Sequence, residues 1–92
     1  MANYDKTLID SSEIFKALGH PARLCIVNRL TNSSGLSVSQ MQECLGVSQS
    51  SISQHLSILK NKGIISGERI GSEVIYSLVD TRMNSLVNVF IK

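Results

Sequence analysis

The chain has 92 residues, a net charge of +2 and a charged fraction of only 17%. This length suits one domain with a small core, the weak positive charge argues against a histone-like or RNA-coating protein, and no apolar run approaches the roughly 18 residues that a membrane span requires. The first ten residues lack the basic and apolar parts of a secretory signal, and two cysteines without such a signal are typical of a reducing compartment. We therefore expect a single cytoplasmic domain over residues 1–92.

The first third of the chain predicts two helices. Asp10 and Glu13 have the spacing of a capping pair for a first helix over about residues 11–18, with an earlier start left open. Pro21 suits the first turn of a second helix, because the N–H that proline lacks is not needed there. This helix is expected to extend to about residue 31. The core-facing stripe of that helix is expected at Leu24, Val27 and Leu30.

Residues 37–45 and 48–62 predict two short helices that only Gly46 and Val47 separate. Ser37 and Gln40 form an S-x-x-Q capping signature before the first of them, and Ser48 is an N-cap candidate for the second. The second helix is expected to end at Gly63. Its buried stripe is narrow and consists of Ile52, Leu56 and Leu59.

The outward face of residues 48–62 is unusually polar. Serine is a mediocre helix former, yet this helix and its cap contain five serines. Small hydrogen-bonding side chains allow a helix to lie close against the major groove of DNA, and two helices joined by a tight turn are the helix-turn-helix arrangement. A merely solvated face is the alternative, and His55 has a structural alternative at the edge of the helix. The predicted DNA-binding residues are Ser48, Gln49, Ser50, Ser51, Ser53, Gln54, His55, Ser57, Lys60 and, farther along the chain, Arg69.

After Gly63 the pattern alternates, and residues 64–69 and 73–78 predict a β-hairpin. A hairpin directly after a groove-reading helix is a wing, whose tip can reach the phosphate backbone or the minor groove. Arg69 is the only cation of this hairpin and Glu73 works against it, so modest contacts are expected. Phosphate contacts are also expected for Lys62 and Arg23, besides Lys60.

The last segment, residues 80–92, predicts another helix with an apolar stripe. Its members are Met83, Leu86 or Val87, Phe90 and Ile91, and the first helix offers Leu8, Ile14, Phe15 and Leu18. These stripes either close the core of one protomer or form a symmetric dimer, and we favour the dimer because so small a chain has little interior. A two-fold dimer would place two reading helices in successive major grooves about 34 Å apart, on a palindromic operator of double-stranded DNA.

Three segments of the chain resemble the ArsR/SmtB family of winged-helix repressors. They are FKALGHPARLCIV from Phe15, LGVSQSSISQHLSILK from Leu45 and GSEVIYSL from Gly71. The resemblance covers about residues 11–82. It implies an α+β, mostly helical, winged helix-turn-helix fold with four helices, two strands and a last helix. It also implies a homodimeric operator-binding repressor that a metal or thiol signal releases from DNA.

The resemblance does not extend to the metal ligands of the family. The three cysteines that many members carry before the recognition helix fall on Ser37, Ser39 and Gln42 in this chain, which are poor ligands for a soft metal. At the second metal site of the family Asp80 fits the first ligand, but Arg82 takes the place of a histidine and cannot ligate. We therefore expect neither a metal nor another cofactor, and the small inducer stays unidentified.

Cys25 and Cys44 are the only thiols. Cys44 is expected to be a small buried apolar residue and Cys25 to be more exposed, while a thiol switch through the two is an open alternative. The sequence has no nucleophile–base spacing, phosphate-binding loop or paired carboxylates, so an enzyme is not expected. Two functions remain, a DNA-binding repressor and a winged-helix module that binds another protein and has weak or lost DNA binding.

Overall fold

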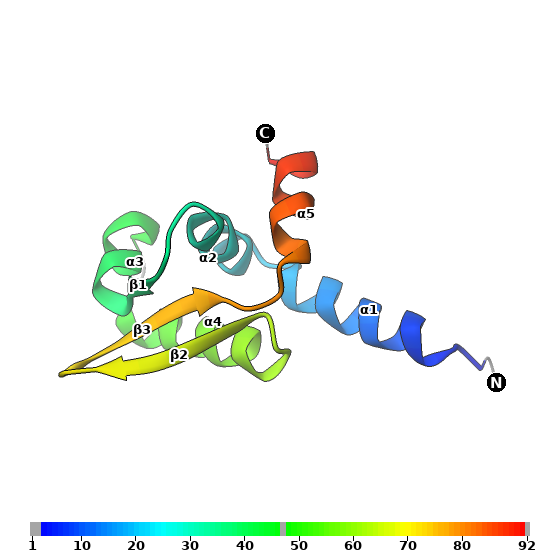
Figure 1. The fold of residues 1–92 in the computed structure, drawn as a ribbon, viewed down its shortest axis with the longest axis horizontal. Coiled ribbons are helices and arrows are strands. Elements are labelled where there is room, and N and C mark those ends of the chain that lie inside the picture. The colour runs from blue at the N-terminus through cyan, green and yellow to red at the C-terminus, as the bar shows by residue number, and fades with distance from the viewer. Residues whose placement is uncertain (1–2, 47, 92) are drawn as a thin grey trace.

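The computed structural model describes residues 3–46 and 48–91, the side chains of Glu43 and Cys44 excepted. Its elements are α1 (Lys6–Leu18), α2 (Pro21–Thr31), β1 (Leu36–Ser37), α3 (Val38–Leu45), α4 (Gln49–Asn61), β2 (Ile65–Ile70), β3 (Glu73–Leu78) and α5 (Arg82–Phe90). The three strands form an antiparallel sheet in the order β1-β3-β2. Figure 1 shows the hairpin tip at one end of the long axis and the start of α1 at the other. The predicted α+β, mostly helical fold is confirmed.

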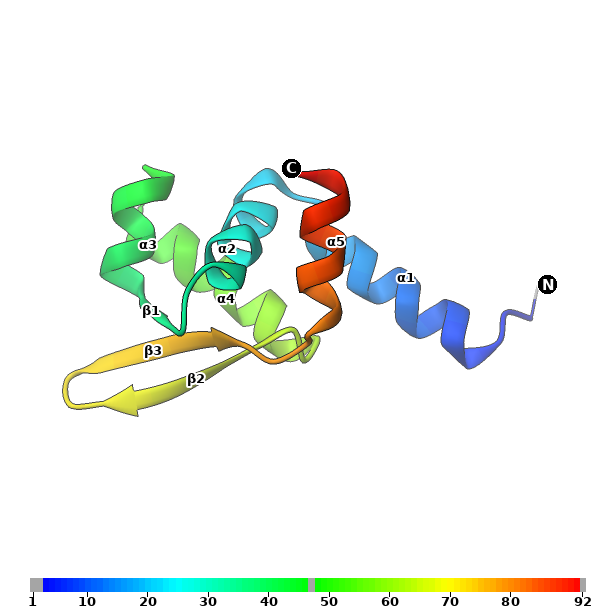
Figure 2. The same ribbon diagram turned by 45° about the horizontal axis from the view of Figure 1, so that its top comes forward.

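α1 begins earlier than residue 11 because Asp5 is its N-cap. The Leu8 amide donates to Asp5 Oδ1 at 2.9 Å, so the predicted capping pair of Asp10 and Glu13 is wrong, and both residues lie inside the helix. The first half of α1 leads away from the rest of the molecule, as Figure 2 shows from a second angle. The first half of α1 therefore projects from the domain, and only its second half belongs to the packed part of the molecule.

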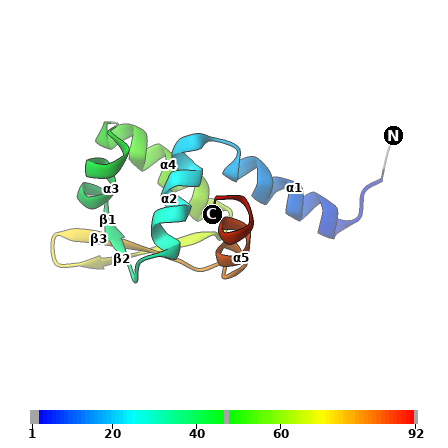
Figure 3. The same ribbon diagram turned by 90° about the horizontal axis from the view of Figure 1, so that it is seen from above.

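α2 has the predicted bounds, with Pro21 at its start. The buried side chains are Ile26, Val27 and Leu30, whereas Leu24 is only half-buried. The predicted stripe is thus wrong at Leu24, because the helix is rotated so that Ile26 faces the interior in its place. Figure 3 shows α5 nearly end-on beside α2, close to the point where α1 joins the body.

Local hydrogen bonds fix both ends of the helix pair. At the start of α3 the Gln40 amide donates to Ser37 Oγ at 3.3 Å and the Ser37 amide donates to Gln40 Oε1 at 2.8 Å, which confirms the predicted capping box. At the end of α4, Gly63 adopts φ +73°. Its amide bonds to the Lys60 carbonyl at 3.0 Å and the Ile64 amide bonds to the Leu59 carbonyl at 3.1 Å, the pattern of a Schellman motif.

The hairpin closes through the two residues Gly71 and Ser72, since Ile70 pairs with Glu73. Gly71 has φ +65° and Ser72 does not have a positive φ, which is the pattern of a type II′ turn. The short strand β1, which the sequence analysis missed, adds to the other side of β3.

The terminal helices divide their apolar residues between the interior and the surface. Met83 and Val87 of α5 and Leu18 of α1 are buried in the core, whereas Phe15 and Phe90 are 61% and 78% exposed. Further exposed apolar side chains on or beside these helices are Tyr4, Leu8, Ile9, Val89 and Ile91. One portion of each stripe therefore closes the protomer, as one of the two alternatives predicted, and the other portion faces solvent. The dimer stays a prediction. Within residues 3–46 and 48–91, no helix has the length and apolar character to cross a membrane.

Candidate nucleic-acid interface

α4 is held against the body by one face only. Ile52, Leu56 and Leu59 are almost fully buried, as the sequence predicted. They pack with the core of α2 and with the two isoleucines that begin the hairpin. The opposite face of α4 is consequently free to meet a partner.

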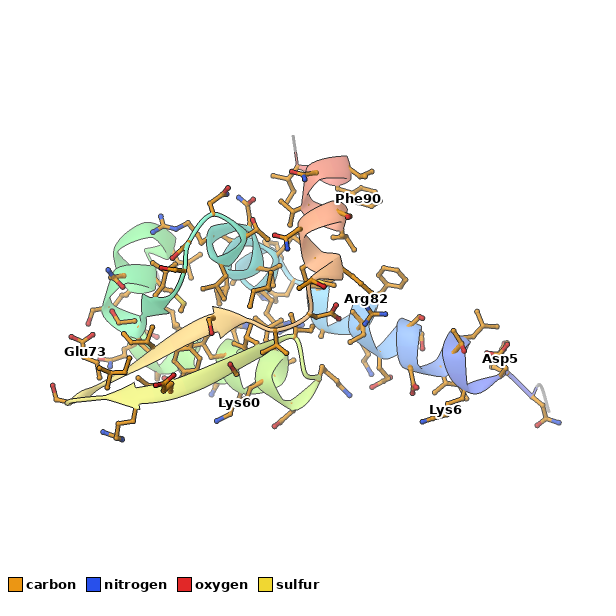
Figure 4. All side chains as sticks on the ribbon, viewed as in Figure 1. Asp5, Lys6, Lys60, Glu73, Arg82 and Phe90 are labelled. Carbon is orange, nitrogen blue, oxygen red and sulfur yellow. The ribbon has the colours of Figure 1, made fainter. Side chains whose placement is uncertain are left out.

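Most of the predicted DNA-binding residues lie on that free face. The exposed ones in α4 and its cap are Ser48, Gln49, Ser50, Ser53, Gln54, Ser57 and Lys60. Figure 4 shows Lys60 projecting outward from the body. Ser51 and His55 are half-buried. The structure thus brings most of the predicted glutamine and serine side chains together on the exposed side of α4.

The serines at the start of α4 form a local hydroxyl cluster. Ser48 Oγ accepts from the Ser51 amide at 3.2 Å and lies 3.0 Å from Ser51 Oγ and 3.2 Å from Ser50 Oγ. Ser48 is therefore an N-cap, as predicted, and its hydroxyl already has a role in the fold.

His55 turns toward α2. Its Nδ1 lies 3.2 Å from Arg23 Nη1, and its ring centroid lies 4.5 Å from that of His20. Burial, and then the charges of His20 and Arg23, lower the pKa of His55 below its ordinary value of 6.5. These contacts are of the kind that the structural alternative for His55 predicts, and its DNA-binding role stays a prediction.

Of the four cations expected to contact phosphates, two are exposed and two have partners within the protein. Lys60 and Arg69 are exposed. Lys62 Nζ donates to Glu13 Oε1 at 2.7 Å, and this hydrogen bond holds the pKa of the Glu13 carboxyl below its ordinary range. Arg23 donates through Nε to the Ala17 carbonyl and contacts His55. Lys62 and Arg23 therefore have partners within the protein. The sequence analysis predicted phosphate contacts for these two residues and did not predict these partners.

The hairpin separates its charges between its two faces. Arg69 is opposite Val74 in the sheet, whereas Glu68 is opposite Ile75 and Ile70 is opposite Glu73. Residues that pair directly share a face. The cation is therefore on the face of Val74, and both glutamates are on the other face; Figure 4 shows Glu73 near the hairpin tip.

Two features of this surface were missed by the sequence analysis. A hollow of about 270 Å³ lies among the starts of α3 and α4 and the hairpin tip, with Ser39, Gln49 and Ser72 in its lining. Ile58 is 38% exposed and follows Gln54 by one helical turn. The spacing to Gln54 could have shown that Ile58 belongs to the outer face, where an apolar side chain can contact a thymine methyl group.

The described part of the chain does not gather the candidate metal ligands into a binding site. Arg82 Nε and Nη2 donate to Asp80 at 2.9 and 2.6 Å, and the hydrogen bonds hold the pKa of the Asp80 carboxyl below its ordinary range. Within the residues that the structure describes, no group of three or more His, Cys, Asp or Glu side chains is placed to hold a metal ion. Cys25 is half-buried beside a cavity of about 330 Å³, and the side chain of Cys44 lies outside the described part, so the thiol switch stays a prediction.

Two adjoining helices, the second held by one face, followed by a β-hairpin, define a winged helix-turn-helix domain. The sequence pattern described as "Bacterial regulatory protein, arsR family" matches residues 20–66. The chain belongs to this family.

Relatives and solved structures agree with that assignment. The chain is 38% identical over 73 residues to the HTH-type transcriptional regulator NmtR of Mycobacterium tuberculosis, a match over 79% of this chain and 60% of NmtR. It is 34% identical over 83 residues to the transcriptional repressor PagR of Bacillus anthracis, over 90% of this chain and 83% of PagR. The crystal structure of the transcriptional repressor BigR from Xylella fastidiosa superposes with a TM-score of 0.84 and 30% identity, over 91% of this chain and 85% of BigR. These names agree with the predicted class, a transcriptional regulator and not an enzyme.

Proposed function

We propose that the chain is a dimeric, sequence-specific DNA-binding repressor that reads an operator with α4. The observation that carries the proposal is the division of α4 into a fully buried apolar face and an exposed face of glutamine and serine. Glutamine can make paired hydrogen bonds to adenine in the major groove. The transcriptional repressors among the similar proteins support repression over activation.

The dimer in this proposal uses the exposed apolar residues of α1 and α5. Phe90 is 78% exposed and projects from α5, as Figure 4 shows, and Phe15 and Leu8 are more than half exposed on α1. A two-fold axis through these helices would set two copies of α4 about one helical turn of DNA apart and would require a palindromic site. Because the target is DNA, the proposal includes a cytoplasmic location.

The first test is a selection from randomised DNA duplexes by the purified protein at about 0.1 M salt. The proposal expects a palindromic sequence whose half-sites have centres about 10 base pairs apart. Recovery of no sequence, with weak binding that vanishes as salt rises, would contradict it. That result would favour a module that binds another protein. The two glutamates on the hairpin face opposite to Arg69 support this alternative.

A substitution then tests the reading residue itself. Gln54→Ala is expected to weaken binding to the selected duplex by about 1–3 kcal/mol, the value of one good base contact. Ser34→Ala, in the exposed loop before β1, is the control and should leave the affinity unchanged. An unchanged affinity of Gln54→Ala would refute this assignment.

The signal that releases the operator is searched for with the same complex. Peroxide treatment tests the predicted switch through Cys25 and Cys44, and zinc, copper and cadmium test for a metal response. A thiol switch requires that peroxide lowers operator affinity and that Cys25→Ser abolishes this effect; the absence of any response would exclude this switch.

A further inference from the structure

Three side chains join α2, α4 and the end of α1 at one point. The imidazole of His20, the N-cap of α2, lies 4.5 Å from the imidazole of His55 in α4, with the ring planes at 44°. Arg23, in the first turn of α2, contacts His55 Nδ1 through Nη1 at 3.2 Å. The same guanidinium donates through Nε to the carbonyl of Ala17 in α1.

We propose that His20, Arg23 and His55 form an acid-sensitive connection that positions α4 for DNA recognition. The inference rests on the proposed function, in which α4 reads the operator. His20 and Arg23 act as positioning residues in it, because their contacts set where α4 lies relative to α2.

The hydrogen bond from Arg23 requires a neutral His55 imidazole. A guanidinium has donors only, so His55 Nδ1 must accept from Arg23 and its ring proton resides on Nε2. The Ala22 amide donates to His20 Nδ1 at 3.0 Å, and the same reasoning places the ring proton of His20 on Nε2. Protonation of His55 at Nδ1 removes the lone pair that the hydrogen bond from Arg23 uses.

In the described part of the chain, the surroundings of His55 include the cation Arg23 and no carboxylate partner. The groups whose charges act on it are His20 and Arg23, both from α2. The end of α1 contributes the uncharged carbonyl of Ala17, and the cavity beside His20 is bordered by the Cys25 thiol and by Leu45 of α3. Among the described residues neither imidazole has a carboxylate within ion-pair distance. A proton on His55 would therefore sit against a guanidinium and a second imidazole.

The direction of the pH effect follows from the lowered pKa of His55. The unfolded chain takes up a proton as the pH falls through 6.5, the ordinary value, while the folded chain resists it. The stabilisation that the cluster provides is therefore complete above about pH 6.5 and is lost as the pH falls below that value. The buried stripe of α4 contains no titratable group, so acid should loosen the placement of the helix and leave the helix formed.

The experiment compares the affinities for the selected duplex and for a scrambled duplex. Protonated histidines also attract phosphates, so the ratio of the two affinities, and not either one alone, reports the placement of α4. Between about pH 7.5 and pH 5.5 the ratio of the wild-type protein is expected to fall roughly tenfold, the factor that the loss of one or two hydrogen bonds produces. Circular dichroism at both pH values verifies that the helices remain.

Two variants separate positioning from a general effect of acid. His20→Asn keeps a good N-cap acceptor but removes the ring that lies against His55, so its ratio should be below that of the wild type at pH 7.5. Because the His20 charge helps to lower the pKa of His55, the ratio of this variant should also change less between the two pH values. His55→Asn retains an acceptor near the position of Nδ1, and its own ratio should change little between the two pH values. Equal acid sensitivity of both variants and the wild type would overturn the inference, and so would a wild-type ratio independent of pH.

The failure of the inference and the failure of the proposed function are distinguishable. A wild-type protein that prefers the selected duplex equally at both pH values retains the function and loses only the acid-sensitive connection. If no duplex is preferred at pH 7.5, the function fails. The connection is then tested by urea unfolding, where the wild type should lose stability between pH 7.5 and 5.5 and the variant with both substitutions should not.

Discussion

Phe90→Ala should weaken the proposed dimer strongly. Burial of a whole phenylalanine side chain stabilises by about 1.5–3 kcal/mol, and Phe90 is 78% exposed in the protomer. Complete coverage of that exposed part at an interface would therefore contribute about 1–2 kcal/mol per protomer, and about 2–5 kcal/mol per dimer because a two-fold axis presents the residue twice. The dissociation constant of the dimer is expected to rise by roughly 30-fold to a few thousand-fold.

Sedimentation equilibrium over a range of protein concentrations measures this change. Ile70→Ala is the matched control, because Ile70 is also a large exposed apolar residue, 58% exposed, but lies on the hairpin. The control should dissociate as the wild type does. If Phe90→Ala dissociates no more readily than Ile70→Ala, Phe90 is not at the interface, and a wild-type protein that is monomeric at every concentration would refute the dimer.

Two further predictions concern α4. Gly63→Ala should lower the free energy of unfolding by about 1–2 kcal/mol, because alanine must adopt the left-handed φ of +73° that ends the helix; urea denaturation measures this, and an unchanged midpoint would contradict it. Lys60→Ala should reduce the slope of log affinity against log salt by about one, the contribution of one phosphate contact. Lys6→Ala, at the far end of α1, is the control for that measurement, and equal slopes for both variants would remove Lys60 from the interface.

The parts of the fold that could be predicted from sequence depend on local interactions. The capping box of Ser37 and Gln40, the cap at Ser48 and the turn at Gly63 each use residues within a few positions, and the stripe of α4 is strictly periodic. α1 was misjudged because Asp10 and Glu13 have the spacing of a capping pair although Asp5 makes the cap. β1 was missed because two residues are too short to show an alternation.

Contacts of the candidate site between residues that are distant in sequence could not be predicted. His55 and Arg23 are 32 residues apart, and Lys62 and Glu13 are 49 residues apart. A sequence pattern shows that these residues are charged or titratable but not which partner they meet. The outer face of α4 could be predicted because it is simply the side that its own apolar stripe leaves free.

The unequal charge of the two hairpin faces has a kinetic consequence for a DNA-binding protein. The duplex repels carboxylates at every phosphate, so a hairpin that arrives with Glu68 and Glu73 toward the backbone is turned away, and one that arrives with Arg69 toward it is retained. We therefore expect the hairpin to favour orientations in which Arg69 faces the duplex during diffusional encounter. We expect this steering to favour encounters in which α4 meets the groove, even though the net charge of the chain is only +2.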